Sequence, residues 1–583
     1  MPLIGTAGHV DHGKSTLIER ITGRDPDRWE EEKRRGLTID LGFSWASLPG
    51  GTEVSFVDVP GHERYLKNML AGIEAIDVAL FVVAADEGWM PQSEEHLAVL
   101  DLLGVDRAVV ALTKIDSVDD DLVELATAEI TAEMEGTTLA GAPIVPLSGV
   151  TGEGVETLLE VLEGLVEEED PGERPRLWID RSFPVAGAGT VVTGSLLDGR
   201  LSVEDAVEVY PRGTRARIRG LQSHERSHET LGPGRRVAVN LAGVDHDDVA
   251  RGDMLGLRGQ WEASSRFTAS LRHARFVDGI EARGAYQLHM GTSALNVDIV
   301  GMDEDLAVLR IDRPLPIAVG DRFILRDTGR HLVVAGGIVL DPGPRATRRA
   351  LSDARLIDPG AHPNEVADRL LESRRVDRLS RIEAHAAGGK PEHAVIVGDR
   401  AVSPDLLDEL GERAILLVDD EHRSHPLRPG LPLATLAERL RVDAAMAEQV
   451  VEVTSDLERL GPDVARPGHG ARLTPEQIAA WEIARDRLVA DLAVPHEDDL
   501  GLDPEVIHLM LRDGELVRVG PGLVYLPEQI ETLRSRMASL DDEFTVAQFR
   551  DAAGLSRKYA VPFLEWADKE GLTVRRGDIR RIR

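Results

Sequence analysis

Residues 8–15 read Gly-His-Val-Asp-His-Gly-Lys-Ser, matching G-x-x-x-x-G-K-[ST], and they stand between a short apolar run and the helical pattern of residues 16–21. Strand, loop and helix in this order are the context of a phosphate-binding loop. Backbone N–H groups of such a loop surround a β-phosphate, the lysine neutralises the β and γ oxygens, and the final hydroxyl is a Mg²⁺ ligand. The stretch predicts an α/β nucleotide-binding domain whose phosphate site contains Gly8, Asp11, His12, Gly13, Lys14, Ser15 and Thr16.

Two further segments fit the metal and γ-phosphate side of this site. A buried-strand pattern runs into residues 58–62, Asp-Val-Pro-Gly-His, where Asp58 can hold the Mg²⁺ shell through water and Gly61 can place an N–H near the γ-phosphate. Before it, residues 35–39 read Arg-Gly-Leu-Thr-Ile. The Thr38 hydroxyl can complete Mg²⁺ coordination only while the γ-phosphate is present, so the segment is a candidate switch.

A third strand pattern leads to the base-recognition side of the site. It runs into residues 113–116, Thr-Lys-Ile-Asp, where the Asp116 carboxylate can accept from the paired N1 and N2 donors of guanine, which adenine lacks. Residues 146–149, Pro-Leu-Ser-Gly, fit a loop over the guanine O6. The ordered motifs predict GTP and GDP as ligands with Mg²⁺, and they place Thr113, Lys114, Asp116 and Ser148 near the base.

The phosphate-binding and switch strings together resemble translational GTPases of the elongation factor Tu superfamily. The resemblance implies that His62 is catalytic: it turns toward the attacking water when the ribosome engages, so hydrolysis is ribosome-stimulated. Two positions depart from the family. Thr113 stands where the family usually has Asn, and Gly149 stands where it usually has Ala after the serine that matches Ser148. The interval from Lys14 to Thr38 is also short for factor Tu, which indicates another subfamily.

Composition sets limits on the rest of the chain. The 583 residues are too many for one core. The sequence has no cysteine, which excludes disulfides and thiolate chemistry, and no apolar run of about 18 residues, which excludes a membrane span. A net charge of −35 argues against polyanion binding through bulk charge, although residues 571–583 hold five arginines and one aspartate. We expect a cytoplasmic, multidomain monomer without a membrane partner.

The chain changes to short β-branched runs with glycine-rich turns after the first domain. Residues 177–183 and 187–194 resemble the second-domain barrel of factor Tu, and a similar strand-rich segment follows. We expect a GTPase domain at residues 1–172, a first β-barrel at 173–259 and a second β-barrel at 260–344.

The first barrel contains a candidate aminoacyl pocket, because the resemblance implies that an aminoacyl group lies against it. Local alignment places Arg181 where the family has an acid and Arg236 where it has a neutral polar residue, with Asp180 adjacent. Two cations imply an anionic side chain. A selenol ionises at neutral pH and can accept charge-assisted hydrogen bonds worth about 1.5–3 kcal/mol each, whereas serine would leave the guanidinium groups unpaired. The pocket is predicted to favour selenocysteine over serine without editing, unless these arginines are surface charges.

The last third of the chain repeats a helix followed by a tight hairpin. In one copy Asp503 caps and Pro504 starts a helix before a hairpin. In the last copy we expect a helix from Phe544 to Ala553, a second helix from Ser556 and a two-stranded wing. Helix, turn, helix and wing form a winged helix. At about 60 residues per unit, we expect four α+β winged helices, at 345–430, 431–473, 474–540 and 541–583.

Residues 554–558, Gly-Leu-Ser-Arg-Lys, and the terminal wing resemble the mRNA-binding end of the SelB family of selenocysteine-specific elongation factors. Arg557 and Lys558 stand at a helix N-terminus, where cations and the helix dipole favour phosphate, and Arg576 and Arg580 are expected to project from the wing. These four residues are predicted to contact an mRNA hairpin, unless they only solvate a small domain.

The resemblance implies a factor that carries selenocysteinyl-tRNA to the ribosome, recognises an mRNA hairpin (SECIS) beside a UGA codon and releases the tRNA on GTP hydrolysis. Two alternatives stay open. One is a GTP-switched regulator whose winged helices bind DNA or another nucleic acid. The other is a general tRNA-carrying translational GTPase with an unrelated appendage.

Overall fold

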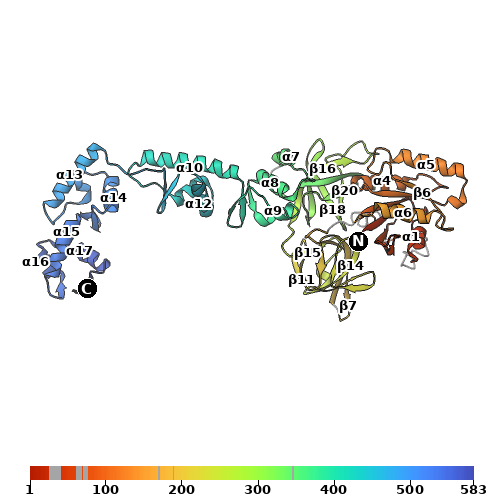
Figure 1. The fold of residues 1–583 in the computed structure, drawn as a ribbon. Coiled ribbons are helices and arrows are strands. Elements are labelled where there is room, and N and C mark those ends of the chain that lie inside the picture. The colour runs from red at the N-terminus through yellow and green to blue at the C-terminus, as the bar shows by residue number, and fades with distance from the viewer. Residues whose placement is uncertain (25–40, 61–68, 70–75, 168–170, 188, 345–346) are drawn as a thin grey trace. The chain divides into compact units, whose positions relative to one another are not determined.

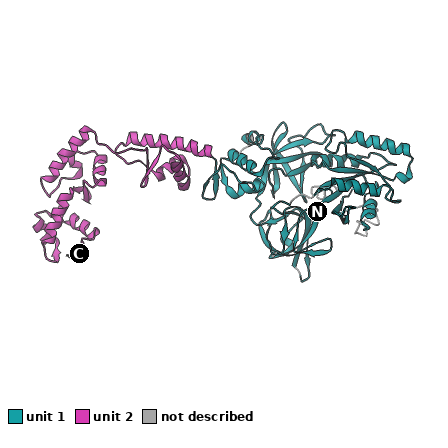
Figure 2. Ribbon diagram, viewed as in Figure 1, with its two compact units in different colours: residues 1–403 teal, residues 404–583 magenta. Residues whose placement is uncertain are grey.

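The computed structural model describes the chain except residues 25–40, 61–68, 70–75, 168–170, 188 and 345–346 (Figure 1). Three candidate residues, Thr38, Gly61 and His62, therefore lie outside the described residues. The chain divides into two compact units, residues 1–403 and 404–583 (Figure 2). Within the part that the structure describes, no helix is both long and apolar enough to span a bilayer.

The first domain is a six-stranded sheet in the order β2-β3-β1-β4-β5-β6, parallel except for β2, which runs antiparallel to β3. Its strands are β1 (Leu3–Ala7), β2 (Gly42–Ser47), β3 (Glu53–Asp58), β4 (Val78–Ala84), β5 (Ala108–Thr113) and β6 (Ile144–Pro146). Helices α1 (Lys14–Thr22) and α6 (Val155–Leu165) share one core with the sheet, and α4 (Pro91–Leu102) and α5 (Asp120–Met134) share another. Every residue of β4 and β5 is buried, because helices cover both faces of a parallel sheet.

Two β-barrels follow. In the first, the order β10-β15-β7-β8-β14-β11 closes because β10 also pairs with β11, and β12 (Arg226–His228) extends β11. Its six barrel strands are β7 (Arg176–Val185), β8 (Gly189–Asp198), β10 (Ala206–Tyr210), β11 (Thr214–Ser223), β14 (Arg235–Ala242) and β15 (Met254–Leu257). The second is a closed barrel in the order β16-β19-β18-β17-β20-β21. Its strands are β16 (Ala263–His273), β17 (Tyr286–Met290), β18 (Ser293–Asp303), β19 (Leu306–Pro316), β20 (Arg322–Asp327) and β21 (Leu332–Asp341).

The second barrel is joined to the first domain on one side and to a small α+β module on the other. Its residues Ala274, Ile324 and Val333 belong to the core that contains α4. The module contains α7 (Thr347–Ala354), α8 (Pro363–Arg374), β22 (Val376–Arg378), α9 (Leu379–His385), β23 (Val395–Val397) and β24 (Arg400–Val402). Arg374 of the module is buried and donates to Asp341 of the barrel, so the module belongs to the first unit.

The second unit begins with a long helix, α10 (Pro404–Ser424), which packs against α11 (Leu433–Leu440) and α12 (Ala444–Val453). The strands β25 (Leu431–Pro432), β26 (Glu458–Leu460) and β27 (Asp463–Ala465) form a sheet beside them. The expected boundary between residues 430 and 431 separates α10 from the helices that it packs against. We therefore propose instead that the second winged helix begins at Pro404.

Two further modules complete the second unit. The third contains α13 (Pro475–Val489), α14 (Pro504–Arg512), β28 (Val517–Gly520) and β29 (Leu523–Tyr525). The fourth contains β30 (Glu543–Thr545), α16 (Val546–Ala553), α17 (Arg557–Lys569), β31 (Thr573–Arg576) and β32 (Ile579–Ile582). Helix α15 (Pro527–Ala538) packs against α16, so we propose that this module starts before α15 and not at residue 541. The expected helix start at Phe544 is wrong: Phe544 lies in β30, and Thr545 caps α16 by accepting from the N–H of Gln548.

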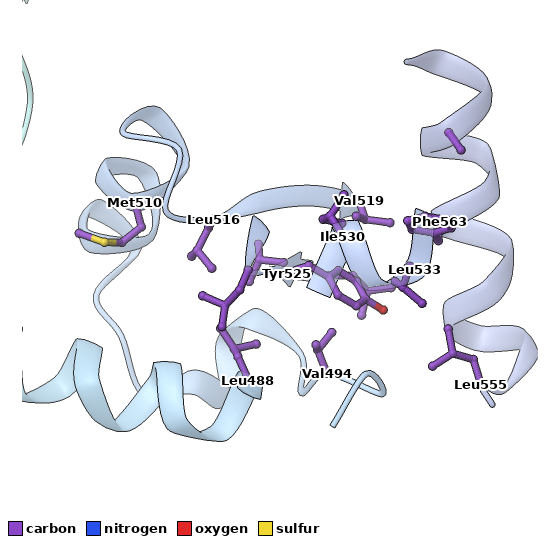
Figure 3. Close-up of a cluster of buried hydrophobic side chains, with 14 of the residues drawn as sticks. Leu488, Val494, Met510, Leu516, Val519, Tyr525, Ile530, Leu533, Leu555 and Phe563 are labelled. Atoms are coloured by element: carbon purple, nitrogen blue, oxygen red, sulfur yellow. The ribbon is translucent and has the colours of Figure 1, made fainter. Parts of the chain in front are cut away.

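The third and fourth modules share one hydrophobic core (Figure 3). Leu488 of α13, Tyr525 of β29, Leu533 of α15 and Phe563 of α17 all belong to it. Figure 3 shows the side chains of Tyr525 and Leu533 between the strands of the third module and α17. The last two winged helices thus form one cooperative packing unit. With the GTPase-like sheet, two barrels and a terminal winged helix, the expected fold class is confirmed.

Candidate functional site

The phosphate-binding loop has backbone conformations that only glycine adopts easily. Gly8 and Gly13 have φ angles of 126° and 89°. A Cβ at Gly8 would lie 2.1 Å from the carbonyl oxygen of Val82. The loop therefore packs directly onto β4, and helix α1 begins immediately after it at Lys14.

Lys14 is buried inside the loop. Its Nζ donates to the carbonyl oxygens of Gly8 at 3.0 Å and His9 at 2.6 Å. Burial lowers the pKa of Lys14 to about 8. Anionic phosphate oxygens at this place would favour the charged ammonium, as the sequence pattern predicts.

Ser15 and Asp58 meet at the start of α1. The Ser15 Oγ donates to Asp58 Oδ2 at 2.7 Å, and Thr6 Oγ1 donates to Asp58 Oδ1 at 2.7 Å. The Asp58 side chain is thus oriented by two hydroxyl groups while being almost fully buried. Hydroxyl and carboxylate oxygens are the hard donors that Mg²⁺ takes in phosphate sites, so the residues present fit that ion.

Two side chains of α4 contact the phosphate-binding loop and were not predicted from the sequence. The N–H of Gly8 donates to His96 Nδ1 at 2.9 Å, and the N–H of Val10 donates to Gln92 Oε1 at 3.1 Å. Burial lowers the pKa of His96 to about 3, which keeps the ring neutral and its Nδ1 an acceptor. Both residues lie more than 80 positions after the loop, so spacing gave no signal for them.

The base-recognition segments meet the loop through one hydroxyl group. Thr113 Oγ1 donates to the carbonyl oxygen of His12 at 2.7 Å, which supports the interpretation that threonine ties the two segments together. Lys114 has a left-handed φ of 58°, and Ser148 is buried while its Oγ accepts from backbone N–H groups at 3.1 and 3.2 Å. Asp116 is exposed, where a guanine edge could reach it.

The candidate aminoacyl pocket contains a compact ion pair. Arg236 of β14 donates to Asp180 of β7 through Nε at 2.9 Å and Nη2 at 2.8 Å. Thr193 Oγ1 donates to the same carboxylate at 2.5 Å. The β7–β8 register shifts between Ile179 and Arg181, so Asp180 sits at a β-bulge. The charge of Arg236 is therefore balanced by Asp180, the acid that the sequence places beside Arg181.

Of the four cations predicted to contact an mRNA hairpin, three lie at the surface of the terminal winged helix and one is buried. Arg557, Lys558 and Arg576 are exposed. Arg580 does not project: it is 3% exposed, and its Nε donates to Asp568 Oδ2 at 2.9 Å. Side chains alternate between the two faces of a strand: Ile579 and Arg581 face outward from β32, so Arg580 between them faces inward.

A cavity of about 320 Å³ lies beside these residues. It is lined on its polar side by four arginines and two acids, Arg550, Arg557, Arg575, Arg580, Glu565 and Asp578. Arg550 and Arg575 were not predicted as site residues. Arg550 lies in the last turn of α16 and lines the cavity together with Arg557 of α17.

Family models match four parts of the chain. They are the Elongation factor Tu GTP binding domain at residues 1–168, Elongation factor Tu domain 2 at 189–256, the Selenocysteine-specific elongation factor beta-barrel domain at 265–346, and the Elongation factor SelB winged helix at 536–582.

Full-length relatives and a solved structure agree with these models. The selenocysteine-specific elongation factor of Desulfomicrobium baculatum is 34% identical, with 100% of both chains covered. That of Escherichia coli (strain K12) is 32% identical, covering 99% of this chain and 98% of the relative. The crystal structure of a bacterial selenocysteine-specific elongation factor, EF-Sec, matches with a TM-score of 0.73 at 27% identity and covers 100% of both chains. The chain is a translational GTPase that binds guanine nucleotide, and it belongs to the family of selenocysteine-specific elongation factors.

Proposed function

We propose that this chain delivers selenocysteinyl-tRNA to the ribosome at UGA codons beside an mRNA hairpin, and that it releases the tRNA on GTP hydrolysis. The observation that carries the proposal is the cluster of Arg236, Asp180 and Thr193 beside Arg181 on the first barrel. In this proposal the protein acts as a monomer in the cytoplasm, where ribosomes are.

In the pocket, Asp180 orients Arg236 for an anionic side chain. The Nε and Nη2 groups of Arg236 bond to Asp180 and Thr193. The Nη1 amino group takes no part in these bonds, and we assign it together with Arg181 as the donor to a selenolate. Asp180 orients Arg236, and the guanidinium groups of Arg236 and Arg181 can each offer a charge-assisted hydrogen bond to a selenolate. A serine hydroxyl carries no charge, so its hydrogen bonds to the same groups are weaker.

In the nucleotide site, Lys14 and the loop N–H groups other than those of Gly8 and Val10 bind the phosphates, and Asp116 with Ser148 selects guanine. Ser15 and Asp58 are the described residues that would hold Mg²⁺, with Thr38 as a further ligand. When bound, the ion neutralises negative charge on the β- and γ-phosphates. We assign His62 to positioning the attacking water and Gly61 to the γ-phosphate. Those three assignments rest on the family resemblance.

In the terminal winged helix, we assign Arg557, Lys558 and Arg576 to the phosphate backbone of the mRNA hairpin. The cavity supports this placement, because Arg575 and Arg550 line it beside Arg557, although Glu565 and Asp578 line it too. We assign Arg580 an indirect role through its bond to Asp568, which holds the wing in place. Such a surface binds RNA with a strong dependence on salt.

The test compares affinity of the GTP form for selenocysteinyl-tRNA in the wild type, Arg236→Ala, Arg181→Ala and the matched control Arg200→Ala, an exposed arginine of the same barrel just after β8. We expect each pocket variant to lose about tenfold to a hundredfold in affinity, since a charge-assisted bond contributes about 1.5–3 kcal/mol. The control should bind like the wild type. Equal losses in all three variants would refute the assignment of the pocket.

A further inference from the structure

The turn between β11 and β12 has a strained backbone. His224 and Glu225 form it, with φ angles of 51° and 62°. Ser223 and Arg226 pair on either side of it, so the turn has two residues. Two-residue hairpin turns with both residues at positive φ normally contain Asn and Gly. A histidine there needs other contacts to compensate for the unfavourable conformation.

Those contacts come from the GTPase domain. The His224 ring stacks on Trp45 of β2, with centroids 4.5 Å apart and planes 16° apart. His224 Nε2 lies 3.2 Å from Ser55 Oγ of β3. The guanidinium carbon of Arg24, two residues after α1, lies 3.6 Å from the centre of the Trp45 ring. The turn therefore packs against β2 and β3, the two strands at one edge of the sheet of that domain.

The same turn is linked to the aminoacyl pocket. Ser223, the residue before His224, donates through Oγ to the carbonyl oxygen of Arg236 at 3.0 Å. Phe43, two residues before Trp45 on β2, has its ring centre 5.0 Å from the guanidinium carbon of Arg236. Two alternate side chains of β2 thus contact the barrel: Trp45 contacts the turn, and Phe43 contacts Arg236 in the pocket.

The other end of this chain of contacts is the nucleotide site. Strand β2 pairs with β3, where Trp45 lies opposite Ser55 and Gly42 lies opposite Asp58. Asp58 in turn accepts from Ser15 of the phosphate-binding loop. A change at Asp58 therefore has a continuous path of strand pairing and side-chain contact to Arg236.

We propose that the β11–β12 turn is a latch through which the nucleotide site positions Arg236, with His224 as the positioning residue. The inference rests on the proposed function, because it assigns Arg236 to the aminoacyl pocket. In the GTP form, the stacked Trp45 and His224 hold the turn against β2, and Ser223 fixes the backbone of Arg236. When β2 and β3 shift after hydrolysis, the turn moves and the pocket loses its geometry.

The test uses hydrogen exchange of the full chain with GDP and with a non-hydrolysable GTP analogue. Peptides that contain β11, β12 and β14 should exchange about tenfold more slowly with the analogue, within the range typical of coupled sites. The difference should fall below about twofold in His224→Asn, which keeps a residue tolerant of positive φ, and in Trp45→Leu, which removes the ring from the other side. His228→Asn, on β12 of the same hairpin, is the control and should behave like the wild type.

Two results would overturn the latch: no nucleotide dependence in the wild-type hairpin, or full dependence in both His224→Asn and Trp45→Leu. A second arm separates this failure from failure of the proposed function. It measures how much more tightly the analogue form than the GDP form binds selenocysteinyl-tRNA. We expect this ratio to fall about tenfold in His224→Asn. If the wild type does not prefer selenocysteinyl-tRNA over seryl-tRNA, the proposed function fails, whereas the exchange data still decide whether the latch exists.

Discussion

Replacing Arg580 by alanine should lower the free energy needed to open the last two winged helices locally, and it should not remove an RNA contact. The side chain is 3% exposed, and its Nε donates to Asp568 Oδ2 at 2.9 Å. Asp568 also accepts from Thr573 Oγ1 at 2.6 Å, so one carboxylate joins α17 to both strands of the wing. Alanine would leave that carboxylate without its cation.

The size of the effect follows from this geometry. A hydrogen bond between charged groups contributes about 1.5–3 kcal/mol, and breaking a fully buried pair costs about 3–5 kcal/mol. The Asp568 side chain is 22% exposed, so water partly replaces the lost partner and the lower range applies. We expect the free energy of opening to fall by about 2 kcal/mol, which speeds exchange about 30-fold for amides that exchange through this opening.

Hydrogen exchange of the full chain measures this directly. Faster exchange should extend from α17 and the wing to β29 of the third module, because Phe563 and Tyr525 share one core. Arg576→Ala is the matched control: that side chain is exposed, so exchange should stay as in the wild type. RNA affinity should instead fall, with the salt dependence reduced by about one phosphate contact. Unchanged exchange in Arg580→Ala, or equal acceleration in both variants, would refute the reasoning.

Three further outcomes follow from single residues. Tyr525→Phe should leave the unfolding free energy of the terminal modules unchanged or raise it by about 1 kcal/mol in denaturant titration, because the buried Tyr525 hydroxyl has no hydrogen-bond partner among the described residues; a loss of stability would contradict this. Burial lowers the pKa of His96 from its ordinary 6.5 to about 3, so the unfolded chain binds the proton first as pH falls. The stability of the first domain should therefore fall as pH drops from about 6.5 toward 3, by up to about 1.4 kcal/mol per pH unit from this group. His96→Gln should flatten that slope. Thr113→Val should weaken GDP binding about fivefold in calorimetry, since it removes one hydrogen bond to the His12 carbonyl, and unchanged affinity would show that the tie is unimportant.

The geometry of the phosphate-binding loop was predictable because its chemistry is local in the sequence. Gly8, Gly13 and Lys14 must stand at fixed spacing for the loop to form, and that spacing is visible without a structure. His96 was not predictable in this way. Its role depends on α4 packing against the start of the loop, and an isolated histidine in a helix carries no signal of a contact 88 positions away.

The terminal modules show what could not be predicted from the sequence. Arg580 was expected to project from the basic wing together with Arg576, yet its place in β32 turns it inward onto Asp568. We also propose other module boundaries than those expected, since helices α10 and α15 precede the hairpins that were visible in the sequence. The sequence marks turns and wings well. Which neighbouring helix packs against them is decided by tertiary contacts between apolar faces, and α15 shows this through Leu533 in the shared core.

We propose that the pocket around Arg236 recognises a negative charge on the aminoacyl group. The most direct measurement is affinity of the GTP form for one tRNA that carries selenocysteine, cysteine or serine, each over pH 6.5 to 8.5. We predict tight, nearly constant affinity for the selenocysteinyl form, and affinity for the cysteinyl form that rises with pH as its thiol approaches a pKa near about 8.5. The seryl form should bind weakly at every pH. Equal, pH-independent affinity for all three would contradict the account.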